Sequence, residues 1–237
     1  MPTALITGAN RGLGLEFTRQ YLDDGWRVIA CCRIPDQADD LKALAQGNGE
    51  LVVEKLDVTD FAAIDELGRQ YEGQPIDLLL NNAGIIGAFP IAEKISTQHF
   101  GSIDYDLWVE VLRTNTFAPV RMAEVFLENV AASDQKKIVT ISSSVGSISE
   151  MTIPGISYAS SKTALNRAMT IIASQLRDRG IIVAMFCPGY VKTRMDAFGY
   201  AMVEIEDSIS ALRPMIAGLT IEKTGSFTGH DGRTIGW

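Results

Sequence analysis

The chain has 237 residues, of which 46% are hydrophobic and 21% charged, so it can form a substantial buried core. Its formal net charge of −8 argues against partners that need a basic surface, namely nucleic acids and anionic membranes. Its three cysteines, Cys31, Cys32 and Cys187, lack disulfide-framework spacing, which predicts buried reduced thiols and a cytoplasmic protein. We expect neither a signal peptide nor a membrane span.

Apolar runs alternate with amphipathic stretches along the whole chain. Continuous apolar runs predict buried strands at about residues 2–7, 26–32, 51–55, 76–80, 136–142, 181–187 and 226–230. Helical periodicity predicts helices at about residues 15–24, 37–46, 60–71, 104–130, 157–179 and 205–217. This alternation predicts an α/β fold, with a doubly wound, mostly parallel seven-stranded sheet and helices on both faces. No linker divides the chain, so residues 1–237 form a single domain in this prediction.

Several residues mark the ends of the predicted helices. Asp60 and Asp104 precede helical patterns and are expected N-caps, because a side-chain oxygen there accepts from the first free N–H groups. Gly180 follows the helix predicted at 157–179 and stands where a C′ glycine belongs. Residues 85–103 are expected to form a loop with a short helical turn.

A glycine-rich turn joins the first predicted strand to the first predicted helix, with the sequence Thr7-Gly8-Ala9-Asn10-Arg11-Gly12-Leu13-Gly14. Glycines allow a tight turn and let a pyrophosphate approach a helix N-terminus. Glycines at this spacing also occur in ordinary turns, but the strand before and the helix after favour phosphate binding. We therefore predict a nucleotide site here.

Tyr158 and Lys162 are four residues apart in a predicted helix, so both lie on one face, one turn apart. An ammonium beside a phenol stabilises the phenolate, so we expect a lowered tyrosine pKa. Such a tyrosine can exchange a proton with a substrate oxygen. The alternative is a pair of ordinary surface residues.

Asn115 and Pro119 are also four residues apart, within the helix predicted at 104–130. A proline lacks the N–H that would bond the carbonyl four residues back, so the Asn115 carbonyl is expected to be free to bind a water. The alternative is a tolerated kink in a long helix.

Taken with Asn81-Asn82-Ala83-Gly84, Ser143 and Pro188-Gly189, these motifs resemble the short-chain dehydrogenase/reductase family over essentially the whole chain. The segment PGYVKTRM and the terminal GHDGRTIGW are similar to the branch with the C-factor protein and sniffer-type carbonyl reductases. The resemblance implies a Rossmann fold and an NADPH-dependent carbonyl reductase. It also implies that Asn115, Ser143, Tyr158 and Lys162 are the catalytic residues.

The cofactor implied by the resemblance is NADP(H) in preference to NAD(H). Arg33 follows the second strand where NAD-binding relatives carry an acid, and Arg11 lies in the glycine turn; the alternative is two solvated arginines. Asp57 is expected to accept from the adenine amino group, or else to cap the loop before Thr59. The full predicted cofactor set is Gly8, Asn10, Arg11, Gly12, Leu13, Gly14, Arg33, Asp57, Val58, Asn82, Ala83, Gly84, Tyr158, Lys162, Pro188, Gly189, Val191 and Thr193.

The substrate is expected to be an uncharged aldehyde, ketone or quinone, because the candidate pocket residues are mostly apolar. A lid is predicted at about residues 193–203, and the segment from Ser143 to Tyr158 is longer than is common in the family. The expected substrate contacts are Ile85, Ser144, Met151, Ile153, Tyr190, Met195 and Phe198.

Two other functions stay open at this point. A nucleotide-binding signalling protein of the C-factor type would need no turnover, and an NAD-using dehydrogenase would need an acid near Arg33. His99 and His230 lack metal-ligand spacing, so no metal site is expected. The resemblance is compatible with a homodimer or homotetramer, which the sequence itself does not show.

Overall fold

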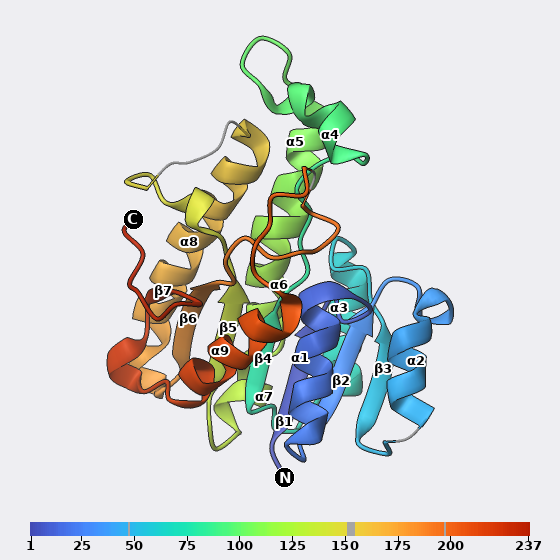
Figure 1. Cartoon of the computed structure of the whole chain (residues 1–237). Coiled ribbons are helices and arrows are strands. Elements are labelled where there is room, and N and C mark those ends of the chain that lie inside the picture. Colours follow the sequence, from blue (N-terminus) through green and yellow to red (C-terminus); the bar gives the residue numbers. More distant parts are fainter. Residues whose placement is uncertain (47, 151–154, 197) are drawn as a thin grey trace.

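A parallel β-sheet forms the centre of the molecule, with helices on both of its faces (Figure 1). The structure, a computed structural model, describes residues 1–46, 48–150, 155–196 and 198–237. The strand order is β3-β2-β1-β4-β5-β6-β7, and every neighbouring pair is parallel. The strands are β1 Thr3–Thr7, β2 Arg27–Cys32, β3 Leu51–Lys55, β4 Leu78–Asn81, β5 Lys137–Ile141, β6 Ile182–Cys187 and β7 Phe227–Gly229. The predicted seven-stranded, doubly wound sheet is confirmed.

The helices pack against the sheet through two separate layers of buried apolar side chains. Alternate side chains of β1 enter opposite layers, with Leu5 in one and Ala4 and Ile6 in the other. The first layer includes side chains of α3, α6 and α8, and the second includes side chains of α1, α2 and α9. The helices are α1 Gly12–Asp23, α2 Asp39–Gln46, α3 Phe61–Gln70, α4 Ile91–Lys94, α5 Tyr105–Leu112, α6 Ala118–Val125, α7 Leu127–Ala131, α8 Ile156–Leu176 and α9 Ile205–Ala217.

The order of the strands reverses between β1 and β4. From β1 the chain continues to β2 and β3 on one side, whereas β4 is followed by β5, β6 and β7 on the other. In open parallel sheets, ligands bind outside the carboxyl ends of the strands at such a reversal. The segments that follow β1, β4, β5 and β6 meet at this edge, which is therefore the place to look for a site.

The helix predicted at 104–130 is wrong as a continuous element. Asp104 does cap it, accepting from the Leu107 N–H at 3.0 Å, but α5 gives way to a π turn at Arg113–Phe117 before α6 and α7. In that turn the Ala118 N–H bonds the Arg113 carbonyl, five residues back. Pro119 has no N–H to continue the α-helical pattern, and single π turns often mark functional sites.

The other predicted helix ends agree with the structure to within a few residues. Asp60 accepts from the Ala63 N–H at 3.1 Å and caps α3. Beyond α8 the chain makes a short 3₁₀ turn and ends it at Gly180, whose φ of 71° is left-handed. The strands predicted at 76–80 and 226–230 run Leu78–Asn81 and Phe227–Gly229 instead.

All three cysteines are free thiols, as predicted; Cys31 and Cys32 are buried as expected, and Cys187 is buried too. Burial raises the pKa of both Cys31 and Cys32, so neither is a ready thiolate. Across the four described ranges, no helix has both the length and the hydropathy to cross a membrane.

Candidate active site

The glycine turn folds tightly against the end of β4. A Cβ on Gly8 would lie 2.9 Å from the Ala83 Cα, and one on Gly14 would lie 2.3 Å from the Gly8 carbonyl oxygen. Gly8 and Gly12 have φ values of 68° and 54°, which are left-handed. Arg11, just before α1, gives the helix no side-chain cap. The turn therefore presents an uncapped helix N-terminus, and the crowding leaves room for glycine only.

The asparagine after β4 ties the sheet edge together. The Asn82 Nδ2 donates to the carbonyls of Thr7 at 2.9 Å and Gly8 at 3.2 Å. The Thr7 hydroxyl accepts from the N–H groups of Asn82 and Ala83, each at 3.1 Å. These bonds hold the glycine turn against β4, so the Asn82 side chain has a structural role in this structure.

Three arginines gather beside the glycine turn. The pKa of Arg11 is lowered by partial burial and by the positive charges of Arg194 and Arg33. Arg194 also stacks over the Phe89 ring, with its guanidinium carbon 5.5 Å from the ring centroid. The mutual repulsion of three cations is relieved by an anion, so the cluster favours a bound phosphate.

Asp57 has a partner within the chain. Its carboxylate accepts from the Thr59 N–H at 2.9 Å and from the Thr59 hydroxyl at 2.7 Å. The loop-capping alternative is therefore the role that the structure shows, and the adenine contact stays a prediction. The neighbouring Val58 is buried in the core.

Tyr158 and Lys162 lie one turn apart on α8, as predicted, with the Lys162 Nζ 5.9 Å from the centre of the Tyr158 ring. The ammonium donates to the Ile141 carbonyl at 2.9 Å, at the carboxyl end of β5. Gly84 lies against the same group, since a Cβ there would stand 3.7 Å from Nζ. The pair therefore faces the edge at which the strand order reverses.

The expected lowering of the Tyr158 pKa is wrong for this structure. Burial raises the pKa of Tyr158 to about 12, with a further rise from Cys187, while a hydrogen bond with the Ser143 side chain opposes the shift. Burial likewise lowers the pKa of Lys162 to about 8. Burial is the largest cause of both pKa shifts, and the Lys162 Nζ donates to a carbonyl and not to the phenol oxygen. Tyr158 is thus a neutral phenol, the form that donates a proton.

The three serines after β5 have different surroundings. The Ser142 hydroxyl is buried and donates to Asn166 Oδ1 at 2.6 Å, which makes it structural. The Ser143 side chain contacts Tyr158 and caps a short 3₁₀ turn by accepting from the Val145 N–H at 3.4 Å. The Ser144 N–H donates to the Cys187 Sγ at 3.2 Å. Ser143 is therefore the serine beside the tyrosine, as predicted.

Asn115 lies fully buried in the π turn and acts here through its side chain. Its Oδ1 accepts from the Ile85 N–H at 2.8 Å, and its Nδ2 donates to the Ile85 carbonyl at 2.7 Å and to Ser161 Oγ at 3.0 Å. Sequence reasoning missed these bonds, because it considered only the main-chain carbonyl. That carbonyl's water stays a prediction.

The segment after β6 that is predicted to form the lid is held by backbone and side-chain contacts. Val191 pairs with Val203 in a parallel bridge, which joins the two ends of this segment. Asp196 accepts from the Tyr190 hydroxyl at 2.7 Å and from the N–H groups of Tyr200 and Ala201, each at 3.1 Å. Sequence reasoning missed this organising role of Asp196, for which no local signal exists.

The predicted substrate residues differ in their exposure. Ile85 and Met195 are half-buried, whereas Tyr190 is 49% and Phe198 52% exposed. Met151 and Ile153 lie outside the described residues. At the start of the lid, Thr193 lies near Gly12, where an added Cβ would stand 3.9 Å from the Thr193 methyl. The predicted lid segment thus begins beside the glycine turn.

Gly189 lies in the loop after β6 and has a φ of 86°. It packs against the His230 ring, which an added Cβ on Gly189 would meet at 2.6 Å. His230 therefore has a packing role in this structure. In the part of the chain that the structure describes, no group of three or more His, Cys, Asp or Glu could hold a metal.

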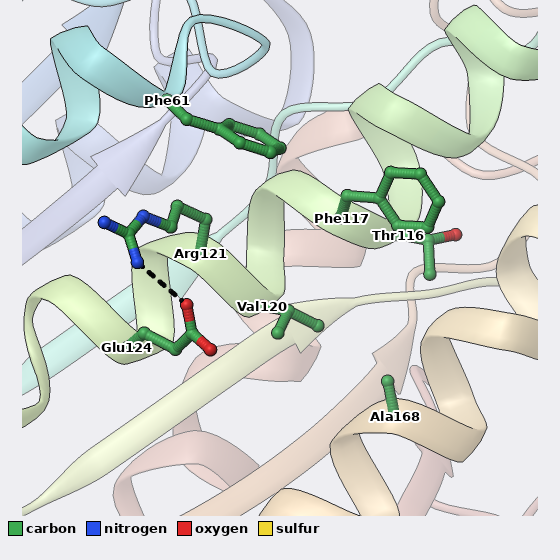
Figure 2. A pocket seen from close by; sticks show the side chains of 7 residues that line it. All are labelled: Phe61, Thr116, Phe117, Val120, Arg121, Glu124 and Ala168. Carbon is green, nitrogen blue, oxygen red and sulfur yellow. Dashed lines mark hydrogen bonds and ion pairs between the residues drawn. The ribbon is translucent and has the colours of Figure 1, made fainter.

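A separate cavity of about 580 Å³ lies between α3, α6 and α8 (Figure 2). Its lining is mostly apolar, with an ion pair between Arg121 and Glu124 at 3.0 Å. The lining residues are Phe61, Thr116, Phe117, Val120, Arg121, Glu124 and Ala168. None of them is a predicted site residue. We place the candidate site at the carboxyl edge instead, because the neutral tyrosine, the lysine and the glycine turn meet there.

The chain belongs to the short-chain dehydrogenase family of oxidoreductases, since the family model for short chain dehydrogenase matches residues 2–202. The carbonyl reductase Sniffer of D. melanogaster has the same fold, with a TM-score of 0.89, 28% identity and complete coverage of both chains. An NADPH-bound carbonyl reductase from chicken fatty liver gives a TM-score of 0.90 at 30% identity, covering 100% of this chain and 99% of the other. The C-signal protein of Myxococcus xanthus is 28% identical over 69% of this chain and 93% of its own length.

Proposed function

We propose that this protein reduces an uncharged carbonyl compound with NADPH, and that Tyr158 donates the proton. The observation that carries the proposal is the neutral phenol of Tyr158, whose pKa is raised to about 12, beside Ser143 and one helical turn from Lys162. These groups lie at the edge of the sheet that also holds the glycine turn. The likeness to two carbonyl reductases supports the reaction class.

The residues at this edge fit a dinucleotide. Gly8 and Gly14 leave no room for a Cβ, and the N-terminus of α1 is without a side-chain cap. The cluster of Arg11, Arg33 and Arg194 offers positive charge for phosphates, and in particular for the 2′-phosphate that distinguishes NADPH from NADH. The name of the chicken relative supports NADPH over NADH. When bound, the nicotinamide supplies the hydride.

The chain's own residues supply the proton and the orientation. The Ser143 hydroxyl and the Tyr158 phenol hold the carbonyl oxygen of the substrate, and Tyr158 gives its proton to that oxygen as negative charge develops there. Lys162, with a pKa of about 8, can return a proton to Tyr158. Placing both groups in advance contributes to the rate because neither has to be ordered during the reaction.

The substrate is an aldehyde, a ketone or a quinone in this proposal. Arg194, the cation that would recognise an acidic substrate, stacks on Phe89 and lies within the charge field of Arg11, on the side of the glycine turn. The side chains of Ile85 and Met195 are apolar and half-buried. An uncharged carbonyl compound suits such surroundings better than an acid.

The test is a screen of NADPH oxidation over aldehydes, ketones and quinones, with carboxylate-bearing analogues beside them and Tyr158→Phe as the control. We expect turnover of uncharged carbonyls by the natural sequence and a near-complete loss with Tyr158→Phe. Equal rates in the two proteins would contradict the proposed role of Tyr158, and a preference for the carboxylates would contradict the substrate class.

A second candidate function is cofactor-dependent signalling without turnover, which the resemblance to the C-signal protein favours. Such a protein needs the glycine turn but has no use for a buried lysine beside a neutral tyrosine, and burying that lysine is costly. NADPH binding without turnover across the whole screen would favour this candidate. The cytoplasmic location and the homodimer or homotetramer stay predictions.

A further inference from the structure

Gln98 is a buried polar residue that no motif in the sequence marks. It ends a short 3₁₀ turn, Ile95–Gln98, in the connection between β4 and α5, and its side chain is 2% exposed. A buried amide has to be hydrogen-bonded, or it destabilises the fold. The partners of Gln98 are therefore informative.

The Gln98 amide joins two segments that are far apart in the sequence. Its Nε2 donates to the Ile86 carbonyl at 2.8 Å. Its Oε1 accepts from the Ser157 hydroxyl at 2.5 Å and from the Tyr158 N–H at 3.2 Å. One side of the amide thus binds the loop after β4, and the other binds the first turn of α8.

The first turn of α8 needs such a partner. The helix begins at Ile156 after Gly155, which has no side chain that could cap it. The first N–H groups of any helix lack acceptors within the helix itself, and Tyr158 carries one of them. Gln98 supplies that acceptor from another part of the chain.

Two glycines allow the amide to come this close. A Cβ on Gly87, whose φ is 144°, would lie 2.6 Å from the Gln98 Nε2. A Cβ on Gly155 would lie 3.4 Å from the Gln98 Oε1. The backbone on both sides of Gln98 is therefore shaped to receive it.

The opposite side of the Tyr158 backbone is held as well. The Ser161 hydroxyl donates to the Tyr158 carbonyl at 2.7 Å and accepts from Asn115 Nδ2, and Asn115 in turn bonds both main-chain groups of Ile85. The hydrogen bonds close a ring around the tyrosine backbone, which we call the Tyr158 frame. Its members are Gln98, Ile86, Ile85, Asn115, Ser161 and Tyr158.

We propose that Gln98 is a positioning residue that fixes the Tyr158 backbone, and with it the phenol, relative to the loop after β4. This inference rests on the proposed function, because the tyrosine matters through the proton that it donates. Without the amide, the first turn of α8 loses its acceptor and the phenol can move. A displacement of about 1 Å at a reacting group can cost about a hundredfold in rate.

The main test compares Gln98→Met with a matched control, Asn129→Leu. Asn129 is also a buried amide that joins two segments, since it donates to the Tyr71 carbonyl at 2.6 Å and to the Gln74 carbonyl at 2.8 Å. It lies in α7, at the end of the sheet away from the carboxyl ends of the strands (Figure 1). We expect both variants to lose similar stability. Only Gln98→Met should lose kcat, by roughly tenfold to a hundredfold, with unchanged NADPH affinity.

A second variant, Gln98→Glu, separates positioning from simple packing. A protonated glutamic acid has the shape of glutamine and can donate to the Ile86 carbonyl, whereas the carboxylate cannot. Burial raises the pKa of such a group, so kcat should approach that of the natural sequence at low pH and fall as the pH rises. The natural sequence should keep its kcat in the pH range below about 8, the pKa of Lys162, in which Gln98→Glu already loses it.

Hydrogen exchange at the Tyr158 amide gives a readout that does not depend on turnover. We expect protection in the natural sequence and in Asn129→Leu, and at least tenfold faster exchange in Gln98→Met. Unchanged exchange in Gln98→Met would overturn the inference. So would a kcat within twofold of the natural sequence when that sequence turns over. Absence of turnover in the natural sequence as well as in every variant, with Tyr158 exchange altered as expected, would defeat the proposed function and leave the positioning role supported.

Discussion

The Tyr158 frame and the outer edge of the site are built in opposite ways. The outer edge consists of the predicted lid segment and the arginines beside the glycine turn. In the frame, Gln98, Asn115 and Ser161 are at most 2% exposed, and hydrogen bonds of defined length join them. At the outer edge, Phe198 and Tyr200 are 52% and 74% exposed, and the arginines beside the glycine turn repel one another. In our proposal the frame fixes the geometry of the proton donor, while the exposed side chains of the outer edge contact what binds.

This difference assigns separate tasks to the two regions. Changes in the Tyr158 frame or in the glycine turn should affect folding, cofactor binding or the chemical step. Changes at the edge should alter the Michaelis constants and leave the fold intact, because exposed side chains contribute little to stability. Substitutions in each region can test this division.

The largest effect is expected from Gly14→Ala in the glycine turn. The new Cβ would lie 2.3 Å from the Gly8 carbonyl oxygen and 2.5 Å from Asn82 Nδ2, so the turn has to move. We expect NADPH binding to be lost, together with about 1–3 kcal/mol of stability. Fluorescence titration with NADPH and thermal unfolding measure both, and Gly49→Ala is the control, because a Cβ there meets nothing within 4 Å. Normal NADPH binding by Gly14→Ala would contradict the assigned role.

The second effect concerns the buried ammonium of Lys162. Its pKa of about 8 in the folded protein is below the ordinary 10.5, so the unfolded chain binds more protons between these two values. The free energy of unfolding should therefore rise from about pH 8 to about pH 10.5, by on the order of 3 kcal/mol. Lys162→Met should lack this rise.

Urea unfolding at pH 8, 9 and 10 measures that slope in Lys162→Met and in the exposed-site control Lys55→Met. The control should behave as the natural sequence does. An equal slope in Lys162→Met would show that the ammonium is not buried in the way that the structure describes.

A third, smaller effect is expected at the arginine cluster. Arg33→Ala should raise the Michaelis constant for NADPH roughly tenfold, or about 1.4 kcal/mol, and leave that for NADH unchanged. The reason is that only NADPH carries a 2′-phosphate for the cluster to bind. Steady-state kinetics with both cofactors measures this, with Arg69→Ala on α3 as a charge-matched control. Equal changes for NADPH and NADH would refute the assignment.

The sequence accounts for the parts of this architecture that follow from local patterns. Apolar runs and helical periodicity placed the strands and helices, and Asp60 and Asp104 behaved as N-caps because capping depends on neighbouring residues alone. The glycine turn and the spacing of Tyr158 and Lys162 are local patterns as well, and the structure brings these residues to the same edge of the sheet; their role as the site stays a prediction.

What the sequence could not provide depends on contacts between distant segments. Gln98 reaches a helix about sixty residues further along the chain, and no pattern around it announces that partner. The direction of the Tyr158 pKa shift differs from the prediction, because burial is its largest cause and the sequence does not show how deeply the phenol is buried. Pro119 indicates an interruption of the helix near Asn115, because it lacks an N–H. It does not predict the extra residue of the π turn, which depends on the carbonyl that the Ala118 N–H bonds.

The smallest effect is expected at the lid. Phe198→Ala should change the Michaelis constants for bulky carbonyl substrates a few-fold, by removing apolar contact area. Its stability should stay within about 0.5 kcal/mol of that of the natural sequence, because the side chain is 52% exposed. Substrate kinetics and thermal unfolding of the same preparation check both. A large loss of stability would show that Phe198 belongs to the core and would contradict the proposed difference between the Tyr158 frame and the outer edge.

The most direct test of the central claim is the kcat of Tyr158→Phe at saturating NADPH, with NADPH affinity measured on the same sample. The substitution removes the phenol hydroxyl and keeps the ring and the backbone bonds of the Tyr158 frame. If Tyr158 is the proton donor, kcat should fall by about 10²–10⁴-fold while NADPH binds as before. A kcat close to that of the natural sequence would show that the proton comes from another group.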